Sequence, residues 1–443
     1  MNDPKNLLYS NTDFDRFYTS IGKRSVLDAR DDFERDHGRI VHSSAFRRLQ
    51  AKTQVIGPQE GDFHRTRLTH SMEVAQIARG IAIHLNKNSE VLREVGKLDI
   101  SLVEAAALAH DFGHPPFGHQ GERALNEKMN KFGGFEGNAQ TFRILTRLEG
   151  NKKVGLNLTR ATLLSILKYP VVYEDAVNEQ VYSRKENNFK PPKTSVFLED
   201  KKIFDWLLQD FNNEEKEFLT SLEEKRPDGN DELVHRKTIN KTFECSIIEL
   251  ADDIAYATHD LEDALKLKLI DIRDLQGIFE EYKGIYEITE LSEQALGINP
   301  KTDDFTFQLK EFFAKLISIL ITNIEVKVRN FINSPRLRYS AVLPSDLNEI
   351  RERLNSLVKQ EVILSQRVQT IEWKGGQIIR RLFDAMMNDK NLLPKKDREG
   401  WGSKSERERA RQVCDYIAGM TDSYAAKMYA RLFEANAGRL FDI

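Results

Sequence analysis

Histidines gather near one end of this chain. Eight of its ten histidines fall within the first 119 residues. His110 and Asp111 stand side by side, and small apolar residues from Leu102 onward predict a helix that ends there, since Gly113 and Pro115-Pro116 cannot continue it. Adjacent helical residues point about 100° apart, so the pair can share a metal ion only at a helix end or between helices. A mixed nitrogen–oxygen ligand set of this kind suits Mn, Fe, Mg or Ni better than a structural zinc.

A second group of reactive side chains follows in the middle of the chain. Asp252, Tyr256 and Asp260 are spaced by four residues, which places them on one stripe of a single helix. Asp252 lies between Leu250 and Ile254 in an otherwise apolar segment, where an unpaired carboxylate is costly to bury. The spacing therefore favours a functional stripe over an exposed acidic face.

The remaining candidates are expected to be structural or to point elsewhere. A single histidine is more often a surface residue or a satisfied core residue than a ligand. We therefore assign no chemistry to these histidines: His37, His42, His64, His84 and His235. Asp253 and His259 adjoin the acidic stripe but are expected to face away from it.

Composition limits the class of protein. The 443 residues carry 66 Lys and Arg against 69 Asp and Glu, a net charge of −3, so bulk attraction to nucleic acid is not implied. Cys245 and Cys414 lie far apart, which excludes a disulfide scaffold and a thiolate zinc cluster. The apolar run at 316–321 is far shorter than the roughly 20 residues that cross a bilayer. The start of the chain does not read as a signal peptide, and we predict a soluble, cytoplasmic protein without membrane contact.

The elements that must position these residues are mainly helices. Apolar residues recur with helical spacing in five segments: 69–85, 102–110, 245–265, 305–331 and 347–370. Strand patterns are scarce, although Ile40–Val41 and Val55–Ile56 could form short pieces. The polar segment 173–201 is predicted to be an inserted loop or lid, and 227–231 a turn. The basic segment 390–412 reads either as a solvated face or as a contact for anions or polynucleotides.

The order of these motifs resembles the HD phosphohydrolase superfamily, and within it the bacterial deoxyguanosinetriphosphate triphosphohydrolases. The resemblance covers nearly the whole chain, in order, and it extends more distantly to metazoan dNTP hydrolases, without their SAM domain. The matching segments are RDDFERDHGRIVHSSAFRRLQAKTQV (30–55), RTRLTHSMEVAQIAR (65–79), ALAHDFGHPPFGHQGE (107–122), GGFEGNAQ (133–140), LKYP (167–170), ELADDIAYATHDLED (249–263) and CDYIAGMTD (414–422).

The resemblance implies a role for each matching residue. The metal ligands would be His70, His110, Asp111 and Asp252, which would hold one divalent ion such as Mn, Mg or Fe. The catalytic residues would be His119, oriented by Glu122, and His114, which would face the phosphates. The substrate-binding residues would be Arg67, Lys168 and Tyr169 on the phosphates, Gln54 and Tyr256 on the deoxyribose, Asp260, and Asn138 on the weaker evidence of the GNAQ segment alone.

The resemblance also implies an all-α HD fold with additional C-terminal helices. We expect residues 1–63 to contribute to the active site, 64–265 to form the catalytic core, and 266–443 to pack on that core. The implied reaction is metal-dependent hydrolysis of dNTPs, dGTP included, to deoxynucleoside and triphosphate. A homo-oligomer, either hexamer or tetramer, a regulatory dNTP and weak single-stranded DNA binding are further expectations.

Two alternatives stay open at this point. Another HD enzyme, a phosphodiesterase or a 5′-nucleotidase, would not need Gln54, Tyr256 or Lys168. A nucleotide-sensing or single-strand-binding regulator would not need the proton-transfer pair His119 and Glu122.

Overall fold

The computed structural model describes residues 6–18, 27–54, 65–151, 154–183, 189–223, 234–285 and 288–434. His64, the expected strand at Val55–Ile56 and the expected turn at 227–231 lie outside these ranges. Helices dominate the described residues, which confirms the predicted mainly α fold. Strands occur there only as two antiparallel pairs, β1 (Leu222–Glu223) with β2 (Lys237–Thr238) and β3 (Glu325–Val328) with β4 (Tyr339–Val342).

The chain divides into two compact units that are each assembled from distant segments. The first comprises Met1–Asn11, Met72–Ala107 and Thr242–Gln369, and the second comprises Thr12–Ser71, Leu108–Lys241 and Thr370–Ile443. Three of the five boundaries fall within α-helices, namely α3 (Arg67–Asn88), α5 (Ile100–Ala109) and α19 (Gln366–Asn388). The three-part division expected from the sequence stays a prediction.

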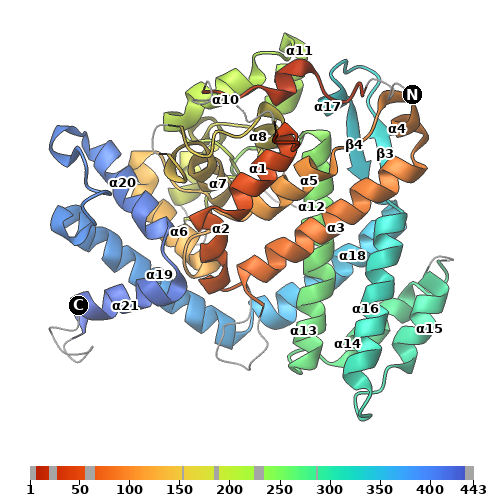
Figure 1. Ribbon diagram of the computed structural model, residues 1–443. Helices are drawn as coiled ribbons and strands as arrows, with labels where there is room; N and C mark the ends of the chain where they lie inside the picture. The colour runs from red at the N-terminus through yellow and green to blue at the C-terminus, as the bar shows by residue number, and fades with distance from the viewer. Residues whose placement is uncertain are drawn as a thin grey trace. The chain divides into compact units, whose positions relative to one another are not determined.

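A long central helix organises the first unit. It runs through α12 (Phe243–Ala255), a π-helical turn (Tyr256–Asp260) and α13 (Leu261–Lys266) without interruption (Figure 1). Ser246 on α12 accepts the Ala341 amide of β4 at 2.9 Å, so the β3–β4 pair is fixed to this helix. The other elements of this unit are α4 (Glu90–Val95), α14 (Ile272–Glu281), α15 (Thr289–Gly297), α16 (Phe305–Thr322), α17 (Pro335–Arg338), α18 (Ser345–Val358) and a π-helical turn (Lys359–Ile363).

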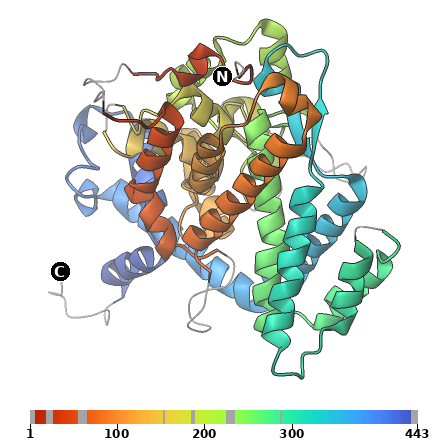
Figure 2. The same ribbon diagram turned by 45° about the vertical axis from the view of Figure 1, so that its right-hand side comes forward.

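Aromatic packing holds the helices that flank the central one. Phe279 of α14 meets Phe312 of α16 edge to face, with ring centroids 5.0 Å apart, and all three side chains of Phe279, Phe312 and Phe313 are buried. Figure 2 shows α14, α15 and α16 as a group of neighbouring helices. The apolar spacing seen in the sequence is what these helices bury against one another.

The second unit has its own apolar core. Helices α6 (Gly118–Met129), α19 and α20 (Glu406–Ala418) supply most of it, with Phe135 and Phe197 from the connecting segments. The other elements are the 3₁₀-helix Asn11–Phe14, α1 (Asp32–Val41), α2 (Ser44–Arg48), the 3₁₀ turn Leu49–Ala51, α7 (Gly137–Arg143), the π-helical turn Ile144–Leu148, α8 (Arg160–Ile166), α9 (Tyr173–Ala176), α10 (Lys201–Leu208), α11 (Asn213–Thr220) and α21 (Asp422–Phe433).

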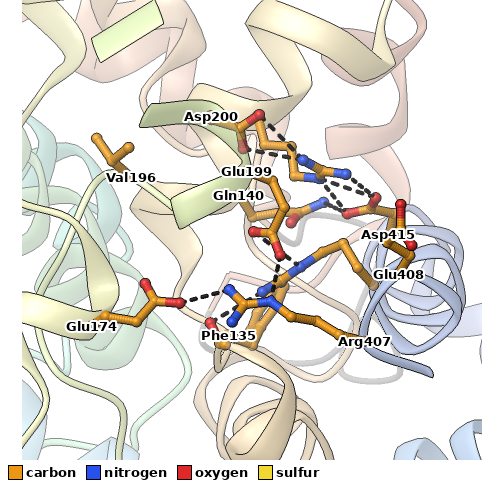
Figure 3. Close-up of polar contacts among 12 residues, drawn as sticks. Phe135, Gln140, Glu174, Val196, Glu199, Asp200, Arg407, Glu408 and Asp415 are labelled. Atoms are coloured by element: carbon orange, nitrogen blue, oxygen red, sulfur yellow. Dashed lines mark hydrogen bonds and ion pairs between the residues drawn. The ribbon is translucent and has the colours of Figure 1, made fainter. Parts of the chain in front are cut away.

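An ionic network joins α7 to α20 in this unit (Figure 3). Arg143, at the end of α7, binds Asp415 of α20 through Nε and Nη2 and binds the fully buried Asp200 through Nη1. Gln140, one turn earlier, donates to the same Asp415 carboxylate at 3.2 Å. Burial opposes the charge of Arg143, but the two carboxylates outweigh it and raise its pKa above the usual value. The network thus fixes the register between the two helices.

Part of the basic C-terminal segment is engaged within the protein. Arg407 binds Glu174 and Glu199, and Arg409 donates to the Trp401 carbonyl at 3.0 Å. Arg411 is buried, with its guanidinium carbon 3.9 Å from the centroid of Phe197. Arg411 and Arg407 are therefore not part of a fully solvated face, and a polynucleotide contact by 390–412 stays a prediction.

Several expected elements differ from those observed. Ile40–Val41 is not a strand but the end of α1, because a capping box formed by Asp31 and Glu34 starts a helix whose buried face includes Ile40. The helix predicted at 305–331 is shorter than expected: α16 ends at Thr322, and the rest of the segment includes strand β3. The segment 347–370 is broken between α18 and α19.

The remaining predicted helices agree closely with the structure. The segments 69–85, 102–110 and 245–265 correspond to α3, α5 and the α12–α13 helix. The expected loop at 173–201 contains α9 and short 3₁₀-helices at Glu179–Ser183 and Leu198–Asp200 in its described part. Among the described helices, none combines the length and the apolar character that crossing a membrane requires.

Candidate functional site

Two candidate residues lie one turn apart at the start of α3. The helix begins at Arg67, whose amide donates to the Lys52 carbonyl at 3.1 Å. Arg67 and His70 are spaced by three residues, so both side chains lie on the same face of the helix. Both are buried, at 5% and 2% exposure. A buried guanidinium beside a buried imidazole requires an acidic partner.

That partner is Asp111, which follows the last turn of α5. Its Oδ2 accepts Nη1 of Arg67 at 2.7 Å, and its Oδ1 lies 2.9 Å from Nδ1 of His114. Burial alone would raise the pKa of Asp111, but His114, His110 and Arg67 outweigh this and hold it well below the usual value. The Asp111 carboxylate is therefore ionised.

The two predicted histidine ligands of this unit are neighbours. The rings of His70 and His110 have centroids 5.7 Å apart and are tilted by 59°. His110 follows the end of α5 at Ala109, as the glycine and prolines after it predicted. The structure therefore brings His70, His110 and Asp111 into one region of the second unit, which suits a divalent cation by the chemistry of its donors.

His114 is a neutral imidazole in this arrangement. Burial and the nearby Arg67 lower its pKa, and they outweigh the opposite effect of Asp111. Nδ1 of His114 faces Oδ1 of the ionised Asp111 at 2.9 Å, but the two atoms are not aligned as a hydrogen bond. The ring of His119 lies 6.3 Å away, centroid to centroid.

His119 and Glu122 form an oriented pair at the start of α6. Nδ1 of His119 lies 3.6 Å from Oε2 of Glu122, while 61% of the His119 side chain is exposed. Glu122 is buried and its Oε1 accepts the Gly137 amide of α7 at 2.9 Å. Burial would raise the pKa of Glu122, but Lys193, His119 and His114 reverse the effect and lower it. An ionised glutamate thus faces an imidazole that solvent can reach.

Lys193 is a site residue that the sequence reasoning missed. Its ammonium group lies 3.3 Å from Oε1 of Glu136, and the charges of Glu122 and Glu136 raise its pKa in spite of burial. Burial and the nearby Glu122 raise the pKa of Glu136, and they outweigh the opposite effect of Lys193. No motif singles out Lys193, because a lysine after two prolines in a polar segment is typical of an exposed loop.

Asn138 and Tyr169 are both held by neighbouring segments. Asn138 donates its side-chain amide to Glu136 at 2.8 Å, so this residue is tied to the Lys193 cluster. Tyr169 exchanges two hydrogen bonds with Ser195, whose Oγ accepts the Tyr169 amide and whose own amide donates to the Tyr169 carbonyl. The segment that carries Lys168 and Tyr169 therefore runs beside the segment that carries Lys193.

The predicted stripe of Asp252, Tyr256 and Asp260 lies on the central helix of the first unit. The π-helical turn covers Tyr256–Asp260, and Asp260 is buried. Burial and then the charge of Asp260 raise the pKa of Tyr256, so the phenol stays protonated. Their neighbours turn elsewhere, as expected: Asp253 pairs with Arg351 at 3.1 Å and His259 lies 3.3 Å from Glu73.

Two histidines to which no chemistry was assigned, His84 and His235, have local partners. His84 is within hydrogen-bond distance of Asn88 on the same helix, and Nδ1 of His235 accepts the Asn178 amide. Burial lowers the pKa of His235 to about 4.

Gln54, a predicted substrate-binding residue, follows the 3₁₀ turn at Leu49–Ala51. Its side-chain oxygen is buried without a hydrogen-bond partner among the described residues.

Comparisons with known proteins place this arrangement in a class. An HD domain matches residues 67–257, and a phosphohydrolase-associated domain matches residues 341–431. The chain is therefore an HD-domain phosphohydrolase by class, and it is a hydrolase.

Curated relatives narrow the class to a family. The chain is 42% identical to a deoxyguanosinetriphosphate triphosphohydrolase-like protein of Shewanella loihica, an alignment that covers 94% of this chain and 96% of the relative. Similar proteins occur in Aliivibrio fischeri, at 39% identity over 92% and 94% of the two chains, and in Deinococcus radiodurans, at 37% over 94% and 95%. The chain belongs to the deoxyguanosinetriphosphate triphosphohydrolase-like family.

A glycine sets how closely the segment after Asp111 approaches α7. A Cβ atom on Gly113 would lie 2.0 Å from the Gly137 carbonyl oxygen and 2.3 Å from the Thr141 nitrogen, both backbone atoms that cannot move aside cheaply. We predict that Gly113→Ala lowers the free energy of unfolding by about 1–3 kcal/mol or more.

The matched control is Gly277→Ala in α14, where an added Cβ meets nothing within 4 Å. That change should stabilise the protein by about 0.5–1 kcal/mol, because alanine is the better helix former. Urea unfolding of both variants measures the difference. Equal stabilities would contradict the close approach of Gly113 to α7.

Proposed function

We propose that this protein hydrolyses deoxynucleoside triphosphates, dGTP included, to deoxynucleoside and intact inorganic triphosphate. The observation that carries the proposal is the His119–Glu122 pair, an accessible imidazole oriented by a buried, ionised carboxylate. Such a pair is suited to general acid–base work at neutral pH. Membership in a family whose members are named for dGTP triphosphohydrolysis supports the choice of substrate.

The proposed metal site consists of His70, His110, Asp111 and Asp252, which would hold one ion such as Mn, Mg or Fe. The neighbouring rings of His70 and His110 support two of these ligands, because imidazole nitrogens suit these cations. Asp111 and Asp252 are proposed from the family resemblance, since the oxygens of Asp111 face Arg67 and His114 in the structure. When bound, a divalent ion polarises phosphoryl oxygens and lowers the pKa of a coordinated water.

The proposed phosphate contacts are Arg67, Lys168, Tyr169 and Lys193. A dNTP brings about four negative charges, and cationic side chains in a partly buried site offset them through charge-assisted hydrogen bonds. Nε of Arg67 is buried without a hydrogen-bond partner among the described residues, which leaves a donor for a ligand. The raised pKa of Lys193 keeps its charge at any physiological pH.

His119 would transfer the proton that the reaction requires. Hydrolysis at the α-phosphorus breaks a bond to oxygen and consumes one water, so a proton must leave the water and one must reach the leaving oxygen. Glu122, whose Oε2 lies 3.6 Å from Nδ1 of His119, would orient this ring. His114, whose pKa is lowered by burial and by Arg67, would be the second imidazole of the site and would face the phosphates, as the family resemblance implies.

The proposed sugar contacts are Gln54, Tyr256 and Asp260, with Asn138 as a further polar contact. Tyr256 is half-buried and protonated beside Asp260, so it is suited to packing against an apolar sugar face. A tyrosine there would collide with a 2′-hydroxyl and so would favour dNTPs over NTPs. A homo-oligomer and a regulatory dNTP stay predictions from the family resemblance. Weak single-strand binding stays a prediction from the basic segment 390–412, and a cytoplasmic location stays a prediction from the sequence.

The first prediction from this proposed function concerns the reaction products and the role of His119. Metal-loaded protein incubated with each dNTP, alone and mixed, should release deoxynucleoside and intact triphosphate, separated by ion-exchange chromatography. His119→Ala should lower kcat by about 10²–10⁴-fold, because proton transfer is lost. His84→Ala, on the solvent side of α3, serves as the control and should keep full activity. Stepwise release of phosphate would instead support another HD phosphohydrolase.

The second prediction concerns the metal and can be tested without turnover. Titration of Mn²⁺ into the apoprotein, followed by calorimetry, should give one tight site per chain. We expect His110→Ala to weaken Mn²⁺ binding by at least about 100-fold, because removing a direct ligand lowers the affinity more than removing a residue that only supports a ligand. His84→Ala is again the control. Unchanged Mn²⁺ affinity in His110→Ala would refute the proposed ligand set.

The third prediction concerns the sugar. Tyr256→Ala should lower the preference for dGTP over GTP, measured as the ratio of kcat/KM values, by about 10–100-fold. The matched control is Tyr282→Ala, which removes a tyrosine from α14's exposed end, where its hydroxyl binds Glu349. An unaltered dGTP-to-GTP ratio in Tyr256→Ala would rule out the steric role.

A further inference from the structure

The segment Cys414–Asp422 has no part in the proposed chemistry, yet it contacts the segments that carry it. It closes α20 at Ala418 and begins α21 at Asp422. Asp415, near its start, binds Gln140 and Arg143 of α7, the helix that also contains Asn138 (Figure 3). The end of the segment makes a second set of contacts, which are directed to backbone atoms.

Asp422 joins two parts of the second unit that carry candidate residues. Its Oδ1 accepts the Phe117 amide at 3.1 Å, between His114 and His119, and its Oδ2 accepts the Thr53 amide at 2.9 Å, next to Gln54. The capping side chain of α21 is Thr421, so the Asp422 carboxylate is not occupied with its own helix. Both of its oxygens serve other segments.

Lys52 completes this connection from the other side. Its side chain is buried, and Nζ donates to the His114 carbonyl at 2.5 Å and to the Ala418 carbonyl at 3.0 Å. Its own carbonyl accepts the amide of Arg67. Burial and then Arg67 lower the pKa of Lys52 to about 7. A neutral amine still has two N–H donors, so both contacts survive deprotonation.

The segment His114–His119 needs such support because its backbone is not regular. Phe117 has a left-handed conformation, with φ 62° and ψ 30°, which costs roughly 1–3 kcal/mol for a residue with a side chain. Its Cβ atom also packs directly on α19, where a Cβ on Gly375 would lie 2.3 Å away. The amide of Phe117 is the one that Asp422 accepts.

We propose that Lys52 and Asp422 are positioning residues, which fix the backbone of His114–His119 so that both imidazoles are held for the reaction. They would touch neither substrate nor metal, and they act only through the segment that they hold. The inference rests on the proposed function for its kinetic consequence, but its structural part is independent of any activity. A displacement of about 1 Å in a reacting group can cost on the order of 100-fold in rate.

The test is Asp422→Asn, compared with wild-type protein by hydrogen exchange and by kinetics. Asparagine keeps one neutral acceptor oxygen and places a donor NH₂ beside the second amide, so one of the two contacts is lost and the other loses its charge assistance. Amides in peptides that cover 108–120 should exchange at least about 10-fold faster, while peptides of α14 should not change. We expect kcat to fall by about 10–100-fold with KM changed less than about 3-fold, because Lys168, Tyr169 and Lys193 lie on other segments.

The matched control is Asp271→Asn, another aspartate at a helix start that accepts a backbone amide, that of Arg273. It should leave both kcat and exchange in 108–120 unchanged. Lys52→Met is the second variant, which removes both donors at nearly constant side-chain length and should reproduce the effect of Asp422→Asn. This variant decides the question if Asp422→Asn does not fold.

Each outcome bears on the proposal. Unchanged exchange in 108–120, or faster exchange with kcat intact, would overturn it. A fall in kcat with slower or unchanged exchange would also overturn it, because the loss would then arise elsewhere. If wild-type protein hydrolyses no dNTP, the proposed reaction fails, and faster exchange in both variants would still support the positioning contacts.

Discussion

The buried carboxylate of Asp111 is the constraint on which the rest of the site depends. It sits directly after the last turn of α5, where the helix dipole already disfavours a negative charge, and it is removed from water. Only its close cationic and imidazole neighbours keep it ionised, with Arg67 at 2.7 Å and His114 at 2.9 Å. The start of α3 and the segment after α5 must therefore stay together, because separating them would leave a buried charge without its partner.

A second balance of charge sets the environment of His119. Two buried glutamates, Glu122 and Glu136, share the single ammonium group of Lys193, and their pKa values move in opposite directions. The carboxylate that faces His119 is the one that stays ionised, while the one tied to Asn138 resists ionisation. The chain thus separates an ionised carboxylate beside His119 from one that caps the start of α7.

The sequence predicts those site residues whose types and spacing indicate their chemistry. His110 and Asp111 stand out because a helix of small residues ends at a glycine and two prolines. Arg67 and His70 were identified only through the resemblance to the family. The sequence analysis did not identify Lys193, Lys52 or Asp422, and the reasons are physical. Lys193 interacts with glutamates that are distant in the sequence. Lys52 binds backbone carbonyls and Asp422 binds backbone amides, and because nearly every residue has these groups, no sequence pattern reveals such contacts. Ile40–Val41 was misjudged because a capping box outweighs the strand preference of two β-branched residues.

Backbone contacts of this kind link the phosphohydrolase-associated region to the HD domain. The HD segment carries the candidate ligands and proton-transfer groups, but it leaves an irregular backbone between His114 and His119 that its own hydrogen bonds only partly satisfy. Gly375 of α19 packs against Phe117, Asp422 of α21 accepts the Phe117 amide, and the Ala418 carbonyl of α20 accepts Lys52, which also binds the His114 carbonyl. Because precise placement of an imidazole requires rigid support, we infer that the associated region helps to position the candidate site.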